Sequence, residues 1–337
     1  MRELCIGHND AGQRLDKFLT KALCDIPPAL LYKAIRKKKI KLNRHRAEGG
    51  NLLREGDRIQ LFLPDAFFPD ARSDEKKQDL ARIHPHLSIL YEDANILLLN
   101  KRPGVLVHED AAERGNTLLT HVQAYLFHKG EYDPDAEQSF APALCNRIDR
   151  NTGGIVIAAK NAEALRIMNR KIRDGEVHKF YLCVVHGIPD PPSATLSAFL
   201  VKDAAANTVQ IFNRRPGPDA KTIRTRYRTL ACIRDRALLE VALLTGRTHQ
   251  IRAHLAYIGH PLLGDGKYGI NRSDRAEGYS HQALYSYRVA FSEGHDDGPL
   301  ASLAGRHFSI PMEDIYFAEP FLRAGLIPFK GDSLHVQ

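Results

Sequence analysis

The sequence lacks the features that mark membrane and secreted proteins. No apolar run approaches the roughly 20 residues that a membrane-spanning helix needs, and no apolar stretch follows the N-terminus as a signal peptide would require. The 5 cysteines include no CxxC pair, which argues against both a disulfide framework and a zinc ribbon. We therefore expect a protein of the reducing cytoplasm that has no membrane partner.

Motifs for nucleotide cofactors and for hydrolases are also missing. No GxGxxG follows a predicted strand, and no GxSxG elbow marks a hydrolase triad. The segment 264–268 shares letters with a phosphate-binding loop, but Pro261 stands where the first glycine belongs and Tyr268 replaces the Ser or Thr. We therefore predict no nucleotide cofactor.

Positive charge is concentrated near the N-terminus. The chain of 337 residues has a net charge of +8, and residues 1–64, with 14 Lys and Arg against 7 Asp and Glu, hold +7 of it. Such a concentrated surplus indicates a polyanionic partner, and nucleic acid is the commonest one. A basic face that only keeps the protein soluble is the alternative.

Residues 14–64 are predicted to form a compact unit. Apolar residues from Leu15 to Leu23 recur at helical spacing, a second helix follows Pro27-Pro28, and a basic turn leads into a short strand. Apolar residues then alternate over 55–63 as a half-buried strand requires.

This order of elements resembles the S-four-like RNA-binding domain, with the Arg-Leu-Asp start at 14–16 and the late Gly-Asp-Arg-Ile strand at 56–59. The resemblance implies that two helices and a strand pair in residues 1–64 present a basic surface to structured RNA. The residues expected to form that surface are Arg36, Lys37, Lys38, Lys39 and Lys41.

The rest of the chain reads as a linker followed by one larger domain. Residues 65–86 are predicted to be a linker because Pro64, Pro69 and a charged run from 72 to 77 show no apolar periodicity. From 87 to 330 strand-like runs outnumber helical ones and are often neighbours in sequence, which predicts an α+β domain with a mixed, mostly antiparallel sheet and flanking helices. The predicted strands cover 89–93, 96–100, 155–159, 180–185, 223–230 and 237–244, and a helix is predicted at 161–173.

The segment 146–154, Asn-Arg-Ile-Asp-Arg-Asn-Thr-Gly-Gly, places polar residues directly before an apolar strand. Asp149 stands between Arg147 and Arg150 there, and adjacent cations favour an ionised carboxylate. A fixed, ionised carboxylate can act as a nucleophile or a base. A structural ion pair in a glycine turn is the alternative that these residues alone leave open.

The segment 245–254, Thr-Gly-Arg-Thr-His-Gln-Ile-Arg-Ala-His, is rich in Arg and His. A metal site is not predicted, because His249 and His254 are five residues apart, which fits one face of a helix poorly, and no Glu lies between them. A third polar site, Tyr181 near the start of the strand 178–185, is more typical of core packing when taken by itself.

Together these segments resemble the RluA-type pseudouridine synthases, which isomerise uridine in ribosomal or transfer RNA. Segment 146–155 is similar to the family's His-Arg-Leu-Asp-x-x-Thr-Ser-Gly motif, although Asn146 replaces the His and Gly153 replaces the Ser. Segment 245–254 is similar to the Thr-Gly-Arg-x-His-Gln-apolar-Arg-x-His signature, and Tyr181 to the tyrosine of a Lys-x-Tyr strand. Further similar segments, in the family's order, are 100–108, 259–265 and 282–288.

The resemblance implies a role for each matching residue. Asp149 would be the catalytic carboxylate and Arg252 its ion-pair partner. Tyr181, the third catalytic residue, would lie against the uracil ring and take part in a proton transfer at C2′. Arg147 would fill the space that a flipped-out uridine leaves in the RNA. Further substrate contacts are expected from Lys101, Arg247, His249 and Gln250.

The resemblance also implies the partner and the reaction. Family members with the N-terminal module mostly act on large-subunit ribosomal RNA, so this RNA is the expected substrate, with transfer RNA as the alternative. The reaction requires no cofactor and no metal, and we expect a monomer. A non-catalytic RNA-binding or ribosome-assembly protein on the same fold, and a hydrolase or nuclease that uses the His-rich segment, remain rival hypotheses.

Overall fold

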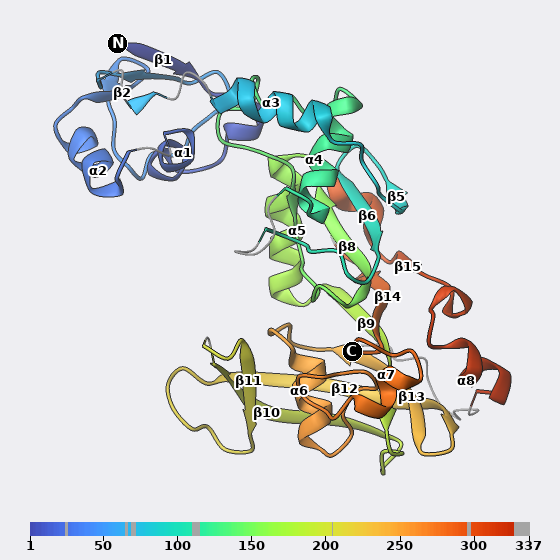
Figure 1. Ribbon diagram of the computed structural model, residues 1–337. Helices are drawn as coiled ribbons and strands as arrows, with labels where there is room; N and C mark the ends of the chain where they lie inside the picture. The colour runs from blue at the N-terminus through green and yellow to red at the C-terminus, as the bar shows by residue number, and fades with distance from the viewer. Residues whose placement is uncertain are drawn as a thin grey trace.

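A computed structural model describes residues 1–23, 26–64, 67–68, 72–109, 115–203, 205–294 and 298–326. Cys24 and Pro69 lie outside the described residues. Figure 1 shows a small N-terminal unit next to one end of a larger unit, whose long sheet extends from β5 and β6 to β10 and β11. No helix among the described residues is long and apolar enough to cross a membrane.

The N-terminal unit has its own four-stranded sheet, in the order β1-β4-β2-β3, and its own hydrophobic core. The predicted helices and the late strand are present, and a further strand at the N-terminus pairs antiparallel with β4. Its elements are β1 (Arg2–Cys5), the 3₁₀ helix η1 (His8–Asp10), α1 (Leu15–Ala22), α2 (Pro28–Arg36), β2 (Ile40–Leu42), β3 (His45–Arg46) and β4 (Arg58–Leu61).

Helix α1 begins where the apolar period begins. Leu15, Phe18 and Leu19 face the core and are fully buried. Arg14 precedes the helix and donates from Nε and Nη2 to the buried carboxylate of Asp16, at 3.1 and 2.7 Å. The Arg-Leu-Asp sequence therefore fixes the start of the helix with an ion pair that lies beside the core.

The predicted basic turn lies between α2 and β2, where Lys38 has a positive φ of 60°. Asn43 and Arg44 both have positive φ, 50° and 68°, and join β2 to β3 in a two-residue hairpin turn. The side chains of residues 36–39 are exposed, and Lys41 is half-buried with its ammonium 5.5 Å from the centre of the Phe62 ring. We call these five basic residues the α2–β2 surface: Arg36, Lys37, Lys38, Lys39 and Lys41.

The predicted linker contains a helix, which corrects the sequence analysis. Helix α3 (Arg72–Arg82) packs against α4 (Leu118–His128). Its contacts to the larger unit include a buried Leu80 and hydrogen bonds from Lys76 to Tyr132 and from Lys77 to Asp133 and Asp135. The helix lacks apolar periodicity because ion pairs and hydrogen bonds supply much of its contact with the domain.

The larger unit confirms the α+β prediction. In the described part of the chain its sheet has eleven strands. Nine of them follow the order β11-β10-β12-β13-β9-β14-β8-β6-β5, and outside this order β7 pairs with β8 and β15 pairs with β14. All of these pairings are antiparallel except that of β14 with β8. The strands are β5 (Ile89–Glu92), β6 (Ile96–Lys101), β7 (Ala143–Leu144), β8 (Gly153–Ala159), β9 (Val177–His186), β10 (Ser193–Asp203), β11 (Thr208–Phe212), β12 (Lys221–Ile233), β13 (Arg236–Leu243), β14 (Leu284–Phe291) and β15 (His307–Ser309).

The helices of this unit cover the sheet over two large hydrophobic cores and a smaller one that includes Ala253 of α6. Helix α5 packs against β8, and helix α6 packs against β11 and β12 (Figure 1). The six predicted strands and the predicted helix at 161–173 are all present, whereas α4, α6, β10 and β11 were not predicted. The helices beyond α4 are α5 (Ala162–Asp174), α6 (Gln250–Tyr257), α7 (Arg272–Ala276), α8 (Glu319–Ala324) and the 3₁₀ helices η3 (Gly298–Leu303) and η4 (Met312–Asp314).

The two units touch through η1. Asn9 Oδ1 accepts a hydrogen bond from the backbone N–H of Ala162, at the start of α5, at 3.0 Å. Arg166 on the same helix donates to the carbonyl of Ala11 at 3.1 Å, and Gln13 donates to Ser139 at 2.9 Å. Polar contacts therefore connect the N-terminal unit to the helix that follows β8.

Candidate active site

The two Arg-rich segments and Tyr181 meet at one cavity of about 300 Å³. Asp149 lies in the loop before β8, Tyr181 on β9, and Arg252 in the first turn of α6. The strands bring them together because β14 pairs with both β8 and β9. The cavity is lined by Cys145, Asn146, Arg147, Ile148, Asp149, Thr152, Ile172, Lys179, Tyr181, Leu243, Gly246, Arg247, Thr248, His249, Gln250, Ile251, Arg252 and Leu284.

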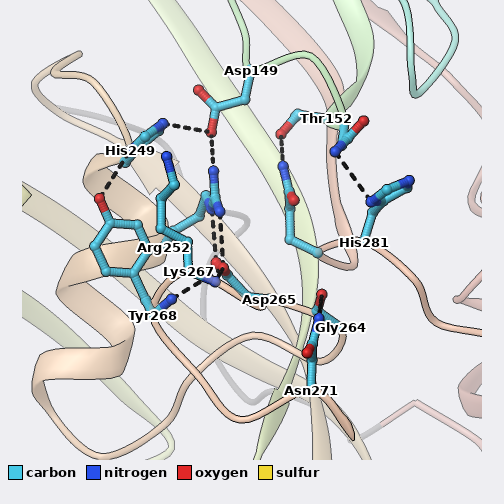
Figure 2. Close-up of polar contacts among 12 residues, drawn as sticks. Asp149, Thr152, His249, Arg252, Gly264, Asp265, Lys267, Tyr268, Asn271 and His281 are labelled. Carbon is cyan, nitrogen blue, oxygen red and sulfur yellow. Dashed lines mark hydrogen bonds and ion pairs between the residues drawn. The ribbon is translucent and has the colours of Figure 1, made fainter. Parts of the chain in front are cut away.

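Arg252 lies between two carboxylates (Figure 2). Its Nη1 donates to Oδ2 of Asp149 at 2.9 Å. Its Nε and Nη2 donate to the two oxygens of Asp265 at 2.7 and 2.8 Å, in a bidentate pair. Asp265 is fully buried, whereas the side chain of Asp149 is 25 % exposed and faces the cavity. The buried carboxylate thus fixes the guanidinium, and the guanidinium fixes the accessible one.

The loop around Asp265 completes this support. Its Oδ1 accepts hydrogen bonds from the backbone N–H groups of Lys267 and Tyr268, at 2.9 and 3.3 Å. Burial acts to raise the pKa of Asp265, but Arg252 and these N–H groups hold it below its ordinary value. Burial likewise opposes the charge on Arg252, and the two carboxylates nevertheless raise its pKa. The segment that shares letters with a phosphate loop therefore serves as an anchor for Arg252.

His249 approaches Asp149 from the other side. Its Nε2 lies 3.9 Å from Oδ2 of Asp149, and its Nδ1 is 2.8 Å from the hydroxyl of Tyr268. His249 has a φ of 53°, in the left-handed region that non-glycine residues rarely occupy, directly before α6. Burial lowers the pKa of His249, with Asp149 acting against that shift, so the neutral imidazole is favoured.

Tyr181 lies inside the cavity wall. The whole residue is buried, and burial raises its pKa to about 12. The phenol therefore stays protonated at neutral pH and can donate a hydrogen bond or offer its ring face to a planar ligand. Cys145, which also lines the cavity, is not a thiolate nucleophile because burial raises its pKa to about 12.

Two residues that differ from the RluA-type motif have visible structural roles. Oδ1 of Asn146 accepts a hydrogen bond from the backbone N–H of Ile157 at 2.8 Å, which ties the Asp149 loop to β8. Gly153 leaves room for a neighbouring ring: a Cβ at this position would lie 2.7 Å from Cδ2 of Tyr285. The loop is thus held by contacts that suit the residues present in this chain.

Comparison with known proteins places this site in a family. The family model described as RNA pseudouridylate synthase matches residues 95–257. The ribosomal large subunit pseudouridine synthase C of Vibrio cholerae is 31% identical over 282 residues, covering 80% of this chain and 81% of that protein. The synthase of the same name from Vibrio parahaemolyticus is 30% identical, covering 81% of this chain and 82% of that protein.

The chain belongs to the RNA pseudouridylate synthase family. It is an RNA pseudouridine synthase, an isomerase that acts on RNA. The fold agrees with this assignment: the solved structure of human RNA pseudouridylate synthase domain containing 4 matches with a TM-score of 0.55 and 19% identity, over 76% of this chain and 98% of that one.

Lys101 was predicted to contact the substrate of this synthase, but it does not line the cavity that contains Asp149. It is 1% exposed, and its ammonium donates to the backbone carbonyls of Arg102, Val105 and Arg150 at 3.1, 2.8 and 2.8 Å. Its three donors are directed to the chain itself, so Lys101 holds the Asp149 loop. Burial lowers its pKa to about 7, with Asp149 acting against that shift.

Gln250 was also predicted to contact the substrate, and in the structure its amide makes hydrogen bonds within the protein. It is buried; its Nε2 donates to the carbonyl of Arg224 and to Thr225, and its Oε1 accepts from Thr245 and the N–H of Arg247. The amide therefore shapes the loop between β13 and α6.

The other predicted residues divide into two groups. Arg147, Arg247 and His249 line the cavity of the synthase, and both arginines are exposed at its rim. The α2–β2 surface belongs to the separate N-terminal sheet, and none of its residues lines the cavity.

The sequence analysis missed the supporting residues. Asp265 and Tyr268 stand in or beside a segment whose family likeness implies no role for them, and Lys179 begins the Lys-x-Tyr motif. Asp265 and Lys179 stand in family segments, and this was the available signal for them. Tyr268 lies outside those segments, and its contact with His249 depends on the fold. Among the described residues, no group of three or more His, Cys, Asp and Glu side chains is placed to hold a metal ion.

Proposed function

We propose that this synthase converts uridine to pseudouridine in large-subunit ribosomal RNA, with Asp149 as its catalytic carboxylate. The observation that carries the proposal is the geometry of Asp149: it faces the cavity and is held by Arg252, which is itself fixed by the buried Asp265. The names of the bacterial relatives, ribosomal large subunit pseudouridine synthases, support this choice of RNA over transfer RNA.

The reaction needs one fixed anion near the sugar. The N1–C1′ bond of uridine breaks, the uracil turns, and C5 bonds to C1′, while the C5 proton leaves and N1 gains a proton. Asp149, on the loop before β8, is the carboxylate that lines the cavity and is open to a substrate there. It acts as a nucleophile at C1′ or as a base at C2′.

Tyr181 is proposed to hold the uracil ring. Its buried ring forms part of the cavity wall, and an aromatic contact with a base contributes about 1–3 kcal/mol. Because its pKa is raised to about 12, the neutral phenol can donate, but it is a poor base before the reaction starts.

A uridine in folded RNA must leave its stack to enter this cavity. Arg147 is exposed at the rim, two residues from Asp149, and its planar guanidinium can occupy the vacated space. Unstacking costs a few kcal/mol, and phosphate contacts can offset this cost. We propose that the α2–β2 surface of the N-terminal unit supplies such contacts by holding structured RNA.

The Asp149→Asn variant tests the assignment. The change removes the anion with almost no change in volume, so RNA binding and the melting temperature should stay close to those of the wild type while tritium release from C5-labelled uridine RNA is lost. Asp219→Asn, at an exposed aspartate that does not line the cavity, is the matched control. Release at the wild-type rate from Asp149→Asn would exclude Asp149 as the catalytic carboxylate.

The substrate is tested separately by mapping pseudouridine in RNA from cells with and without the gene. Loss of a pseudouridine in large-subunit ribosomal RNA, restored by the wild type and not by Asp149→Asn, is the expected result. A loss confined to transfer RNA would overturn the choice of RNA. No loss in any RNA would favour the non-catalytic alternative.

A further inference from the structure

Lys179 lines the same cavity and has no assigned role. It lies on β9, two residues before Tyr181, so both side chains leave the strand on the same face. Among the described residues we find no hydrogen bond or ion pair to its ammonium. A Cβ built on Gly246 would lie 3.8 Å from Nζ, which places the ammonium beside the turn before α6.

The charges around the cavity leave this cation unmatched. The lining residues include one carboxylate, Asp149, and that group is paired with Arg252. Burial lowers the pKa of Lys179, so its ammonium is disfavoured there until an acceptor is bound. An ammonium group in the cavity wall that has no partner among the described residues is suited to bind a hydrogen-bond acceptor of the substrate.

We propose that Nζ of Lys179 donates a hydrogen bond to the O4 carbonyl of the bound uracil and stabilises the negative charge that the ring takes when the N1–C1′ bond breaks. The proposal rests on the function given above, because it needs a uridine whose sugar faces Asp149. It adds a catalytic residue to the cavity wall formed by β9, which also carries Tyr181.

The position of Lys179 favours O4. Tyr181 pairs with Ser286 of β14, which pairs with Gly154 near the start of β8, whereas Lys179 pairs with Val289, three residues further along β14. Since Asp149 precedes β8, Lys179 lies further along the sheet from the loop of the carboxylate than Tyr181 does. In uracil, O4 lies across the ring from N1, whereas O2 is next to it. With C1′ at Asp149 and the ring along Tyr181, the remote carbonyl is the one directed to Lys179.

The chemistry gives this contact a use in both halves of the reaction. When N1–C1′ breaks, its electron pair remains on the uracil and is shared by N1, O2 and O4. A turn of the ring about its N3–C6 axis then exchanges N1 with C5 and O2 with O4. One fixed ammonium therefore holds O4 before the turn and O2 after it, and the charge is neutralised when C5 bonds to C1′, C5 loses its proton and N1 takes one.

A phosphate is the competing ligand for a lysine in an RNA enzyme. The exposed Arg147 and Arg247 stand at the rim, where the RNA backbone must remain. Lys179 is half-buried beside the fully buried Tyr181, on the wall that the base reaches. The base is therefore the favoured ligand, and the phosphate becomes an outcome of the test.

The test compares Lys179→Met with the wild type in single turnover at saturating RNA, on substrates that carry uridine or 4-thiouridine at the target. Sulfur accepts hydrogen bonds weakly. We expect Lys179→Met to lower the rate on uridine RNA by about 10²- to 10³-fold, the usual effect of losing one donor to a developing anion. On 4-thiouridine RNA the same substitution should lower it by less than about 10-fold, with RNA affinity within about 2-fold of wild type throughout.

Two controls keep the result interpretable. Lys202→Met changes an exposed lysine outside the cavity and should match the wild type. If Lys179→Met does not fold, as judged by its melting temperature, Lys179→Gln is tested in the same way and should give a smaller loss because it retains a donor. No pseudouridine from the wild type would refute the proposed function instead.

Three results would overturn the proposal. Weaker RNA binding with a flatter salt dependence and an unchanged single-turnover rate would assign Lys179 to a phosphate. Equal losses of rate on uridine and 4-thiouridine RNA would remove O4 as its partner. Wild-type rates on both substrates would leave Lys179 without a role in the reaction.

Discussion

The guanidinium of Arg252 places Nη1 2.9 Å from Oδ2 of Asp149, while its other two nitrogens, Nε and Nη2, donate to the buried Asp265. The accessible carboxylate of Asp149 is therefore oriented by a guanidinium whose own position is fixed by Asp265. This arrangement separates the proposed catalytic carboxylate from the groups that position it, since Asp265 and the backbone N–H groups around it hold the assembly in place.

The first prediction concerns the shape of this cation. Arg252→Lys retains the charge but loses the fork, so it can serve Asp149 or Asp265 and not both. We expect kcat to fall by about 10²-fold, because a small misplacement of a reacting group has an effect of this size. Single-turnover rates and RNA affinity, measured on the same preparation, are the readout, and an unchanged kcat would show that orientation by the fork is unimportant.

Arg252→Met separates orientation from stability. It leaves the buried Asp265 without its cation, and breaking a buried pair typically costs about 3–5 kcal/mol. We therefore expect a lower melting temperature as well as lost activity. The Arg252→Met, Asp265→Leu double variant removes both charges and should regain much of the stability with no activity. Equal melting temperatures for Arg252→Met and the double variant would mean that the unpaired charge of Asp265 does not cause the loss of stability.

The second prediction concerns Gly153, where the RluA-type motif has Ser. A Cβ there meets the ring of Tyr285, which donates to Asn100 Oδ1 at 2.7 Å and is buried. Gly153→Ser should destabilise the protein by about 1–3 kcal/mol, as overpacking does. Gly50→Ser, at a glycine with open space around it, is the matched control.

A double-variant cycle identifies the cause. If the clash with the ring is the reason, Gly153→Ser combined with Tyr285→Leu should be less destabilised than the two single changes predict together. Denaturant unfolding of the four proteins measures the coupling. Strict additivity would contradict the clash as the cause.

The third prediction concerns His254, which is buried with Nδ1 3.0 Å from the hydroxyl of Thr225. Burial lowers its pKa from 6.5 to about 4. As the pH falls below 6.5 the unfolded chain binds a proton at His254 that the folded protein does not bind until about pH 4, so the free energy of unfolding must fall across this window.

The loss from His254 is at most about 3.5 kcal/mol, since its pKa falls from 6.5 to about 4 and each pKa unit corresponds to about 1.4 kcal/mol. Denaturant unfolding between pH 7.5 and 4.5 measures it, with His254→Gln as the control that removes this proton from the balance. The wild type should lose more stability than His254→Gln over the same range. Parallel curves would show that His254 does not titrate in this way.

Several residues of the cavity could be predicted from the sequence because they stand in short motifs. Asp149, Arg252 and Tyr181 each stand in a segment with a family likeness, and the fold brings all three to one cavity. The direction of a side chain depends instead on the backbone around it. Lys101 ends a buried strand and turns inward to three carbonyls, which no spacing in the sequence indicates.

Strands and helices could be predicted from the sequence where the pattern of apolar residues indicates which side chains are buried. Elements without such a pattern were missed. The apolar strands β6 and β8 are plain in the sequence because they are buried along almost their whole length. Helix α3 was missed because its lysines reach Tyr132, Asp133 and Asp135, partners more than fifty positions away in the chain. Local patterns do not report contacts of that range.

The last prediction concerns the α2–β2 surface. Changing Lys37, Lys38 and Lys39 together to Gln removes three exposed charges from the N-terminal unit and leaves the cavity intact. If these lysines bind phosphates, RNA binding should weaken, and the slope of log K against log salt should flatten by about 0.7–0.9 for each phosphate that is no longer neutralised. The single-turnover rate at saturating RNA should stay within about 2-fold of the wild type, because Asp149 and its support are unchanged.

The matched control is the change of the same three lysines to Arg, which retains the charge and should retain the salt slope. Affinity measured at several salt concentrations, together with single-turnover rates, distinguishes docking from stabilisation. A basic face that only keeps the protein soluble would give the Gln variant a wild-type affinity and slope. A role in stabilising the larger unit, through the contacts of η1 with α5, would instead lower the melting temperature and the rate while the slope stayed the same. Only a flatter slope at an unchanged rate supports the docking role, because counterion release responds to the neutralisation of phosphates and not to the stability of the fold.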